Sequence, residues 1–159
     1  MIGAGAAGME FARVAAPGGH KVTIWEENGQ TGGQLALAAA PPGRQDFLYF
    51  ADYLANACRE LGVRIQYNIK ATPDKILVAV QKVEFNRVVL ATGAQPITPP
   101  IKIEAGAEVL QAWDVLLGRK KTGRNVIIVV GGAVGVDTAL LLAEAGTMDS
   151  QRHCREGLW

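Results

Sequence analysis

The fold of this chain is indicated by residues 2–10, which read IGAGAAGME. Gly3, Gly5 and Gly8 form a G-x-G-x-x-G pattern that runs directly into a helical pattern. Such glycines at a strand-to-helix turn are typical of a dinucleotide-binding βαβ unit. The first permits a tight turn, the second lets the backbone approach a pyrophosphate, and the third lets helix and strand pack closely. We therefore expect a diphosphate to lie against the N–H groups at the start of the helix.

An acidic residue follows the glycine motif at the distance that such a unit requires. Residues 20–26 (HKVTIWE) are rich in β-branched and aromatic side chains, which predicts a strand ending at Glu26. Glu26 stands 18 positions after Gly8, where a carboxylate accepts hydrogen bonds from the adenosine ribose. The alternative is a solvated charge at a strand end, of which the adjacent Glu27 is an example. The spacing favours the ribose interpretation.

Two further segments place small or polar residues where a ligand could meet them. Gly32 and Gly33, followed by Gln34, precede a short alanine-rich stretch. A Gly-Gly pair before a helix offers N–H groups to a phosphate or a flavin edge. The same pair is also common in ordinary turns. Residues 87–91 (RVVLA) predict a buried strand that leads into Thr92 and Gly93. Ligands bind at the carboxyl edge of a doubly wound sheet, so we expect these two residues beside the ligand.

The other patterns predict helices and strands around this site. Apolar residues recur every three or four positions through residues 45–61, which predicts an amphipathic helix with its aromatic residues in the core. The apolar face comprises Phe47, Phe50, Leu54, Ala57 and Leu61. Cys58 lies beside that face and is expected to be an inert buried thiol. Residues 63–67 predict a strand, and residues 75–84 fit either a helix or a β-rich segment.

The second half of the chain repeats the first. After an extended connection over residues 97–107 and a short helix over residues 109–117, residues 125–130 (NVIIVV) predict a buried strand. Three glycines then open a helix that runs to Gly146, which predicts the start of a second dinucleotide-binding unit. These glycines are Gly131, Gly132 and Gly135. Residues 147–159 lack the apolar strand that should follow, and only two residues precede Gly3, so the chain looks cut from a longer protein.

Composition excludes several other classes of protein. The 159 residues are 49% hydrophobic and 19% charged, with a net charge of +1, a balance without the basic surface that nucleic acid or an anionic membrane would need. Cys58 and Cys154 are far apart and outside any metal-binding pattern, so we expect no metal site, no redox disulfide and a reducing, cytoplasmic setting. Residues 126–143 are apolar enough to consider a membrane span, but their glycines and Asp137 favour a strand, a turn and a helix.

Taken together, the motifs resemble the flavin- and pyridine-nucleotide-binding region of the NADH:flavin oxidoreductase family, whose members include 2,4-dienoyl-CoA reductase and trimethylamine dehydrogenase. The motifs are GAGAAGME (3–10), HKVTIWEE (20–27), TGGQL (31–35), PPGRQDF (41–47), VVLATGAQP (88–96), AWDVLLG (112–118) and VIIVVGG (126–132). The resemblance implies that the first three glycines hold the pyrophosphate of FAD, or of ADP in its place, and that Glu26 binds the ribose. It further implies that the same cofactor passes near Gly33, Gln34, Thr92 and Gly93. In the family, electrons pass from NAD(P)H through FAD and an iron–sulfur cluster to FMN in a separate barrel, which this chain lacks.

The sequence thus predicts an α/β fold with a doubly wound, Rossmann-like parallel sheet. Residues 1–100 would form an FAD- or ADP-binding domain and residues 101–146 the start of an NAD(P)-binding domain, followed by the tail 147–159. We expect the dinucleotide-binding portion of an oxidoreductase that passes hydride equivalents from NAD(P)H to flavin, with no catalytic acid, base or nucleophile of its own. The alternatives are a non-catalytic ADP- or FAD-binding module or inactive fragment and, less favoured because no cysteine pair is suitably placed, a disulfide reductase. The isolated chain is not expected to sustain turnover.

Overall fold

The computed structural model describes residues 1–82, 84–104, 106–129 and 131–146. These residues form two compact units. The first unit comprises residues 1–36 and 46–94, and the second comprises residues 37–45 and the described residues from 95 onward.

The first unit is built on a parallel sheet. Strands β1 (Thr23–Trp25) and β2 (Arg64–Gln66) pair in parallel. Ile2 extends this sheet by parallel bridges to Trp25 on one side and to Leu90 on the other. The sheet order is therefore β2, β1, the segment at Ile2 and the segment at Leu90. This is the parallel, crossover-connected sheet that the glycine motif predicts.

The segment at Ile2 lies in the sheet between β1 and the segment at Leu90. Ile2 forms two backbone hydrogen bonds with the segment at Leu90: its N–H donates to the Val89 carbonyl at 2.9 Å, and its carbonyl accepts the N–H of Ala91 at 2.8 Å. On the other side, Gly3 N–H donates to the Trp25 carbonyl at 2.8 Å. The carbonyl of Met1 also accepts the N–H of Trp25 at 3.0 Å, so residues 1–3 all take part in the hydrogen bonding of the sheet.

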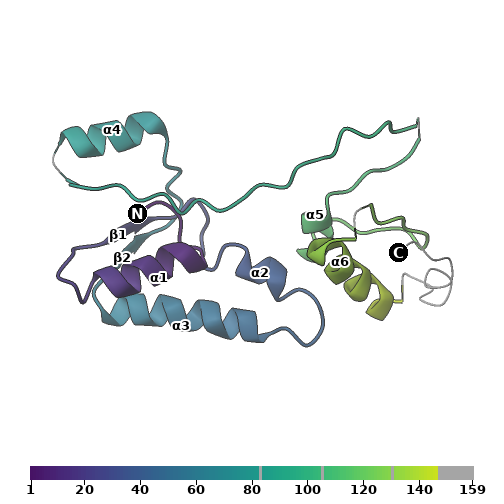
Figure 1. Ribbon diagram of the computed structural model, residues 1–159, viewed down its shortest axis with the longest axis horizontal. Helices are drawn as coiled ribbons and strands as arrows, with labels where there is room; N and C mark the ends of the chain where they lie inside the picture. The colour runs from purple at the N-terminus through teal and green to yellow at the C-terminus, as the bar shows by residue number, and fades with distance from the viewer. Residues whose placement is uncertain (83, 105, 130, 147–159) are drawn as a thin grey trace. The chain divides into compact units, whose positions relative to one another are not determined.

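Helices cover both faces of this sheet, as Figure 1 shows. Helices α1 (Ala6–Ala15) and α3 (Asp46–Glu60) pack on each other on one face, and α4 (Pro73–Gln81) lies on the other. The short helix α2 (Leu35–Ala38) follows the Gly-Gly pair. Helix α4 settles the ambiguity over residues 75–84 because Thr72 caps it, accepting from the N–H of Lys75 at 3.4 Å. Helices on both faces of a parallel sheet confirm the doubly wound fold class.

The core of the first unit lies between the sheet, α1 and α3. Its fully buried members include Ala4, Met9, Ala12, Ile24, Leu54 and Cys58. The prediction that the aromatic residues of α3 are core was wrong: Phe47 is 38% exposed and Phe50 45%. Both lie on the same stripe as the buried Ala51 and Leu54, one turn towards the start of the helix. Because α3 has 15 residues and α1 only 10, the stripe continues past the part that α1 covers.

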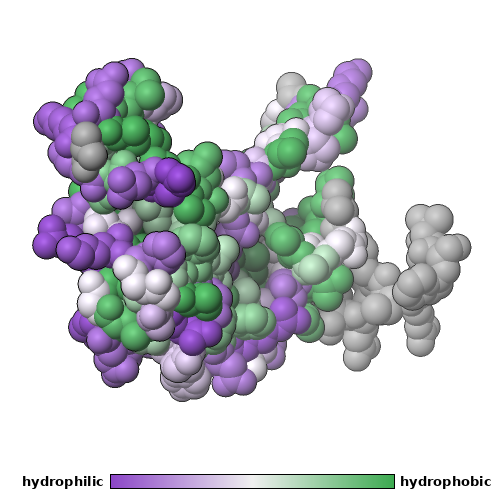
Figure 2. Space-filling model, turned by 60° about the vertical axis from the view of Figure 1, so that its left-hand side comes forward, coloured by the Kyte–Doolittle hydropathy of each residue, from purple (hydrophilic) through white to green (hydrophobic). Residues whose placement is uncertain are grey.

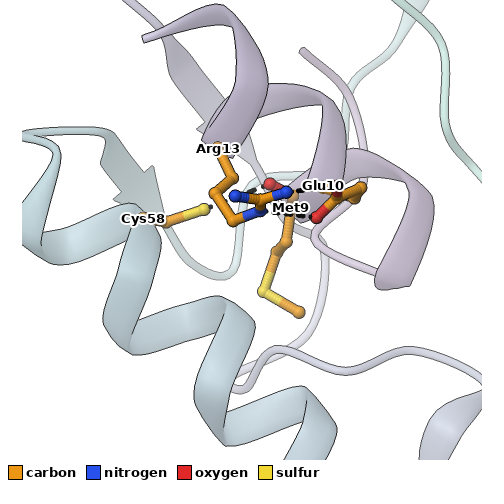
Figure 3. Close-up of polar contacts among 4 residues, drawn as sticks. All are labelled: Met9, Glu10, Arg13 and Cys58. Atoms are coloured by element: carbon orange, nitrogen blue, oxygen red, sulfur yellow. Dashed lines mark hydrogen bonds and ion pairs between the residues drawn. The ribbon is translucent and has the colours of Figure 1, made fainter. Parts of the chain in front are cut away.

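Cys58 joins α3 to α1, as Figure 3 shows. Its thiol donates to the backbone carbonyl of Met9 at 3.3 Å, and burial raises its pKa. The expectation of a buried thiol is confirmed. Beside it on α1, Arg13 donates to both carboxylate oxygens of Glu10, at 2.7 and 2.8 Å. This hydrogen-bonded ion pair lowers the pKa of Glu10, and both side chains are partly exposed. On the face of the molecule that Figure 2 shows, hydrophilic and hydrophobic residues are intermingled.

The second unit contains the helices α5 (Ala112–Leu116) and α6 (Ala133–Glu144), which pack on each other. Arg44 forms an ion pair with Asp137 of α6 at 3.0 Å. Residues 97–104 have no regular secondary structure, in agreement with the predicted extended connection.

The predicted strand at residues 125–130 does not form in its described part. Residues 125–129 adopt no strand, and the side chain of Ile127 is 87% exposed. The physical reason is that a strand is stabilised by pairing, and none of the described residues pairs with this segment. The prediction for the tail 147–159 lies outside the described residues. Among the residues that are described, no helix is both long and apolar enough to cross a membrane.

Candidate dinucleotide site

Two glycines of the first motif are required by the fold itself. Gly3 has a φ of +98°, and a Cβ atom there would overlap the carbonyl oxygen of Ala91 in the neighbouring sheet segment. Gly8 lies in the first turn of α1, where a Cβ atom would overlap the carbonyl oxygen of Gly3. In both cases the obstacle is backbone, which cannot rotate away. These two positions therefore let the sheet and α1 approach closely.

Gly5 differs, because nothing in the fold demands a glycine there. Its φ of −76° and ψ of −177° are open to any residue, and no atom lies within 4 Å of the place that a Cβ would occupy. Gly5 is also the N-cap of α1, and no side chain caps the helix. The first N–H groups of a helix lack acceptors within the helix and carry its positive dipole end. The space beside Gly5 is therefore suited to an anionic group such as a diphosphate.

The carboxylate of Glu26 forms a hydrogen bond with the glycine turn. This carboxylate is buried, at 6% exposure, and Oε2 accepts the N–H of Ala4 at 2.7 Å. The other oxygen, Oε1, accepts both the backbone N–H and the side-chain amide of Asn28, at 2.9 and 2.8 Å. The sequence indicated Glu26 as a ribose ligand but gave no sign of the bond to Ala4. It also missed Asn28, whose only signal was a short amide two residues after the acid.

The Gly-Gly pair lies directly against the glycine turn. Gly32 N–H donates to the Ala4 carbonyl at 2.9 Å. At Gly33, whose φ is +54°, a Cβ atom would lie 3.1 Å from the Cα of Gly5. The sequence therefore brings two loops, separated by a helix and a strand, to the carboxyl edge of one sheet.

The fourth sheet segment completes this edge. The side-chain amide of Gln34 donates to the carbonyl of Ala94 at 3.3 Å, and a Cβ atom at Gly93 would lie 3.2 Å from that amide nitrogen. The backbone of Thr92 passes beside Gly3. The residues gathered at this edge are Gly3, Gly5, Gly8, Glu26, Gly33, Gln34, Thr92 and Gly93. Within the described residues, no three His, Cys, Asp or Glu side chains are grouped to hold a metal ion.

The second glycine motif lies in the other unit. Gly132 is the N-cap of α6, with a φ of −74° and a ψ of −179°, which is nearly the conformation of Gly5. No side chain caps α6, and no atom lies within 4 Å of a Cβ placed on Gly131. Gly135 lies in the first turn of the helix. The start of α6 thus matches that of α1, but without a formed strand among the described residues before it.

A parallel sheet with helices on both faces, and a glycine turn entering an uncapped helix at its carboxyl edge, define a dinucleotide-binding α/β domain. Residues 1–153 match the family described as pyridine nucleotide-disulphide oxidoreductase, and the chain belongs to that family.

Several curated relatives agree with this assignment. The chain is 72% identical over 151 residues to a metal reductase of Desulforamulus reducens, covering 95% of this chain and 23% of the relative. It is 40% identical over 146 residues to a cinnamate reductase of Clostridium sporogenes, covering 92% and 21%. A solved structure of a 2-naphthoyl-CoA reductase complex has a TM-score of 0.81 and 35% identity, covering 91% of this chain and 21% of that one.

These comparisons confirm the resemblance to NADH:flavin oxidoreductases. An NADH oxidase of Thermoanaerobacter brockii is 39% identical over 153 residues. The chain spans less than a quarter of the length of the relatives it matches. It corresponds to the FAD- and NAD(P)-binding portion of flavin oxidoreductases.

Proposed function

We propose that the first unit holds FAD and that the chain serves an oxidoreductase that passes hydride equivalents from NAD(P)H to flavin. The observation that supports this most strongly is the open space beside Gly5, at the uncapped start of α1. At Gly5 the fold would accept alanine, and the N–H groups at the start of α1 have no acceptor within the helix. The glycine therefore leaves room for a ligand. The buried carboxylate of Glu26 accepts the N–H of Ala4, the residue next to Gly5 in the chain.

Each residue at this edge has a role in the proposal. The backbone around Gly5 would bind the pyrophosphate, while Gly3 and Gly8 would let the turn and the helix lie close enough to do so. Glu26 would accept from the adenosine ribose. Gly33, Gln34, Thr92 and Gly93 would flank the remainder of the cofactor. The flavin supplies the hydride chemistry when bound, and the protein supplies position and electrostatics.

The second unit would contribute to NAD(P)H binding. In this proposal residues 1–100 form the FAD- or ADP-binding domain, and residues 101–146 begin the NAD(P)-binding domain, with Gly131, Gly132 and Gly135 facing the pyrophosphate. FMN and an iron–sulfur cluster would belong to a barrel in a longer protein. The greater length of the relatives supports this part. A reducing, cytoplasmic setting completes the proposal and agrees with the free thiol of Cys58.

A non-catalytic module that binds ADP or FAD is the second candidate. The unpaired segment 125–129 favours it, because a nicotinamide nucleotide would need a formed sheet edge before α6. For the same reason we do not expect the isolated chain to sustain NAD(P)H turnover.

Flavin absorbance distinguishes the two candidates. The purified chain is incubated with FAD, desalted, and then titrated anaerobically with NADH or NADPH. Bound flavin that bleaches in this single reduction supports hydride transfer, even where no steady-state turnover follows, whereas bound flavin that stays yellow supports the non-catalytic module. A Gly132→Ala variant is the matched control, because Gly132 is the counterpart of Gly5 at the start of α6; it should retain FAD while losing any bleaching. A chain that retains neither FAD nor ADP would refute both candidates.

A further inference from the structure

Asn28 makes an unusual pair of contacts with the acid of the site. Its backbone N–H and its side-chain amide both donate to one oxygen of Glu26, Oε1, at 2.9 and 2.8 Å. The other oxygen, Oε2, accepts the N–H of Ala4 at 2.7 Å. The two oxygens of one carboxylate therefore have different partners, a loop on one side and the glycine turn on the other.

These contacts leave the carboxylate one place for a further donor. An ionised carboxylate has about four acceptor positions, two on each oxygen. Asn28 fills both positions of Oε1, and Ala4 fills one of Oε2. The position that remains is on Oε2, the oxygen already bonded to the glycine turn. A ribose hydroxyl that donates to Glu26 would thus share an oxygen with the turn that holds the diphosphate.

We propose that Asn28 is a positioning residue. It occupies Oε1 of Glu26, so that only Oε2 can accept a hydrogen bond, and only from a single ribose hydroxyl. This inference rests on the proposed binding of an adenine dinucleotide by the first unit. The side-chain amide of Asn28 prevents the carboxylate from turning, because rotation would break a hydrogen bond to a charged group in a buried setting. Asn28 acts through Glu26 and need not touch the ligand.

Nucleotide analogues test the assignment directly. Isothermal titration calorimetry compares ADP with its 2′-deoxy and 3′-deoxy forms, on the unaltered chain and on Asn28→Ala. The unaltered chain should lose about tenfold in affinity for one deoxy analogue and little for the other, since only one hydroxyl has an acceptor on Glu26. Asn28→Ala should bind ADP about tenfold more weakly and discriminate less between the analogues. Asn28→Ser, which keeps a short donor, should restore part of both.

A matched control and a ligand-free measurement separate positioning from general damage. Asn56, an exposed asparagine on α3, gives the control variant Asn56→Ala, which should change neither affinity nor discrimination. In the absence of ligand, hydrogen exchange at the Ala4 amide should be at least several-fold faster in Asn28→Ala. The exchange rate at this amide reports the strength of its hydrogen bond to the Glu26 carboxylate in the absence of nucleotide.

The outcomes separate this inference from the proposed function. Equal losses for ADP and both analogues in Asn28→Ala, or unchanged discrimination, would overturn the inference while leaving nucleotide binding in place. Equal losses for the two deoxy analogues on the unaltered chain would also overturn it, because both hydroxyls would then have acceptors. Failure of the unaltered chain to bind either ADP or FAD would overturn the proposed function, and the inference with it.

Discussion

Replacing Gly5 with alanine should separate what the ligand needs from what the fold needs. The backbone of Gly5 is in a region that alanine adopts freely, and its Cβ would meet no atom within 4 Å. Alanine is a poorer N-cap than glycine, but it also lowers the entropy of the unfolded chain, and the two effects are of similar size and opposite sign. The free energy of unfolding should therefore change by less than about 0.5 kcal/mol.

The effect on the ligand should be much larger. The added methyl group would occupy the open space beside the first N–H groups of α1, where we place the diphosphate. Losing one charge-assisted hydrogen bond costs about 1.5–3 kcal/mol, so ADP and FAD should bind roughly 10- to 100-fold more weakly.

The assay pairs thermal denaturation, followed by circular dichroism, with calorimetric titration of ADP. Gly5→Ala should melt at the same temperature as the unaltered chain without ligand and gain less from added ADP. Gly8→Ala is the matched control: its Cβ would overlap the carbonyl of Gly3, so it should be less stable by about 2 kcal/mol with or without nucleotide. Unchanged ADP affinity in Gly5→Ala would refute the placement of the diphosphate beside Gly5. A large drop in the stability of this variant without ligand would refute the statement that alanine fits at position 5.

Three further predictions concern the fold around the site. Glu26→Gln should lower the free energy of unfolding by about 2–3 kcal/mol in urea titrations, because an amide cannot accept from Ala4 and from both donors of Asn28 at once. Glu27 is exposed, and an equal effect from Glu27→Gln would contradict this prediction. Cys58, in a Cys154→Ser background, should react slowly with a thiol reagent at pH 8 until urea is added. Because burial raises its pKa, its contribution to stability should be present below the unfolded value of about 8.5 and decline as the pH rises above it, and Cys58→Ala should remove that decline. Finally, Leu54→Ala should cost about 2–4 kcal/mol and Phe47→Ala less than about 1 kcal/mol, as urea denaturation would measure; similar costs would show that the start of α3 is covered after all.

The features that the sequence predicted correctly are those encoded by neighbouring residues. The turn at Gly3, the helix that follows and the strand ending at Glu26 depend on local conformation and on a period of two or 3.6 residues. These determine a parallel sheet and so place Gly33 and Thr92 at the same edge as the glycine motif. For this reason the class of fold, and the grouping of residues at one sheet edge, could be predicted without coordinates.

The features that failed depend on what lies opposite a segment in space. The periodicity of α3 correctly identified a stripe, but it carries no information on where the covering helix ends, so Phe47 was misplaced. The apolar run at residues 125–129 has the composition of a buried strand, yet pairing needs a neighbour that composition cannot supply. The contact of Asn28 with Glu26 arises from the loop's conformation, for which the sequence offered one short amide and no spacing rule.

Gly5 and Gly132 adopt matching conformations at the starts of their helices. Their φ and ψ angles agree to within 2°, although one turn continues from a sheet and the other follows a segment without strand pairing. This extended conformation is the one that an N-cap residue typically adopts. The two helix starts therefore differ among the described residues in what lies beside them: a formed parallel sheet adjoins Gly5, and a segment without strand pairing precedes Gly132.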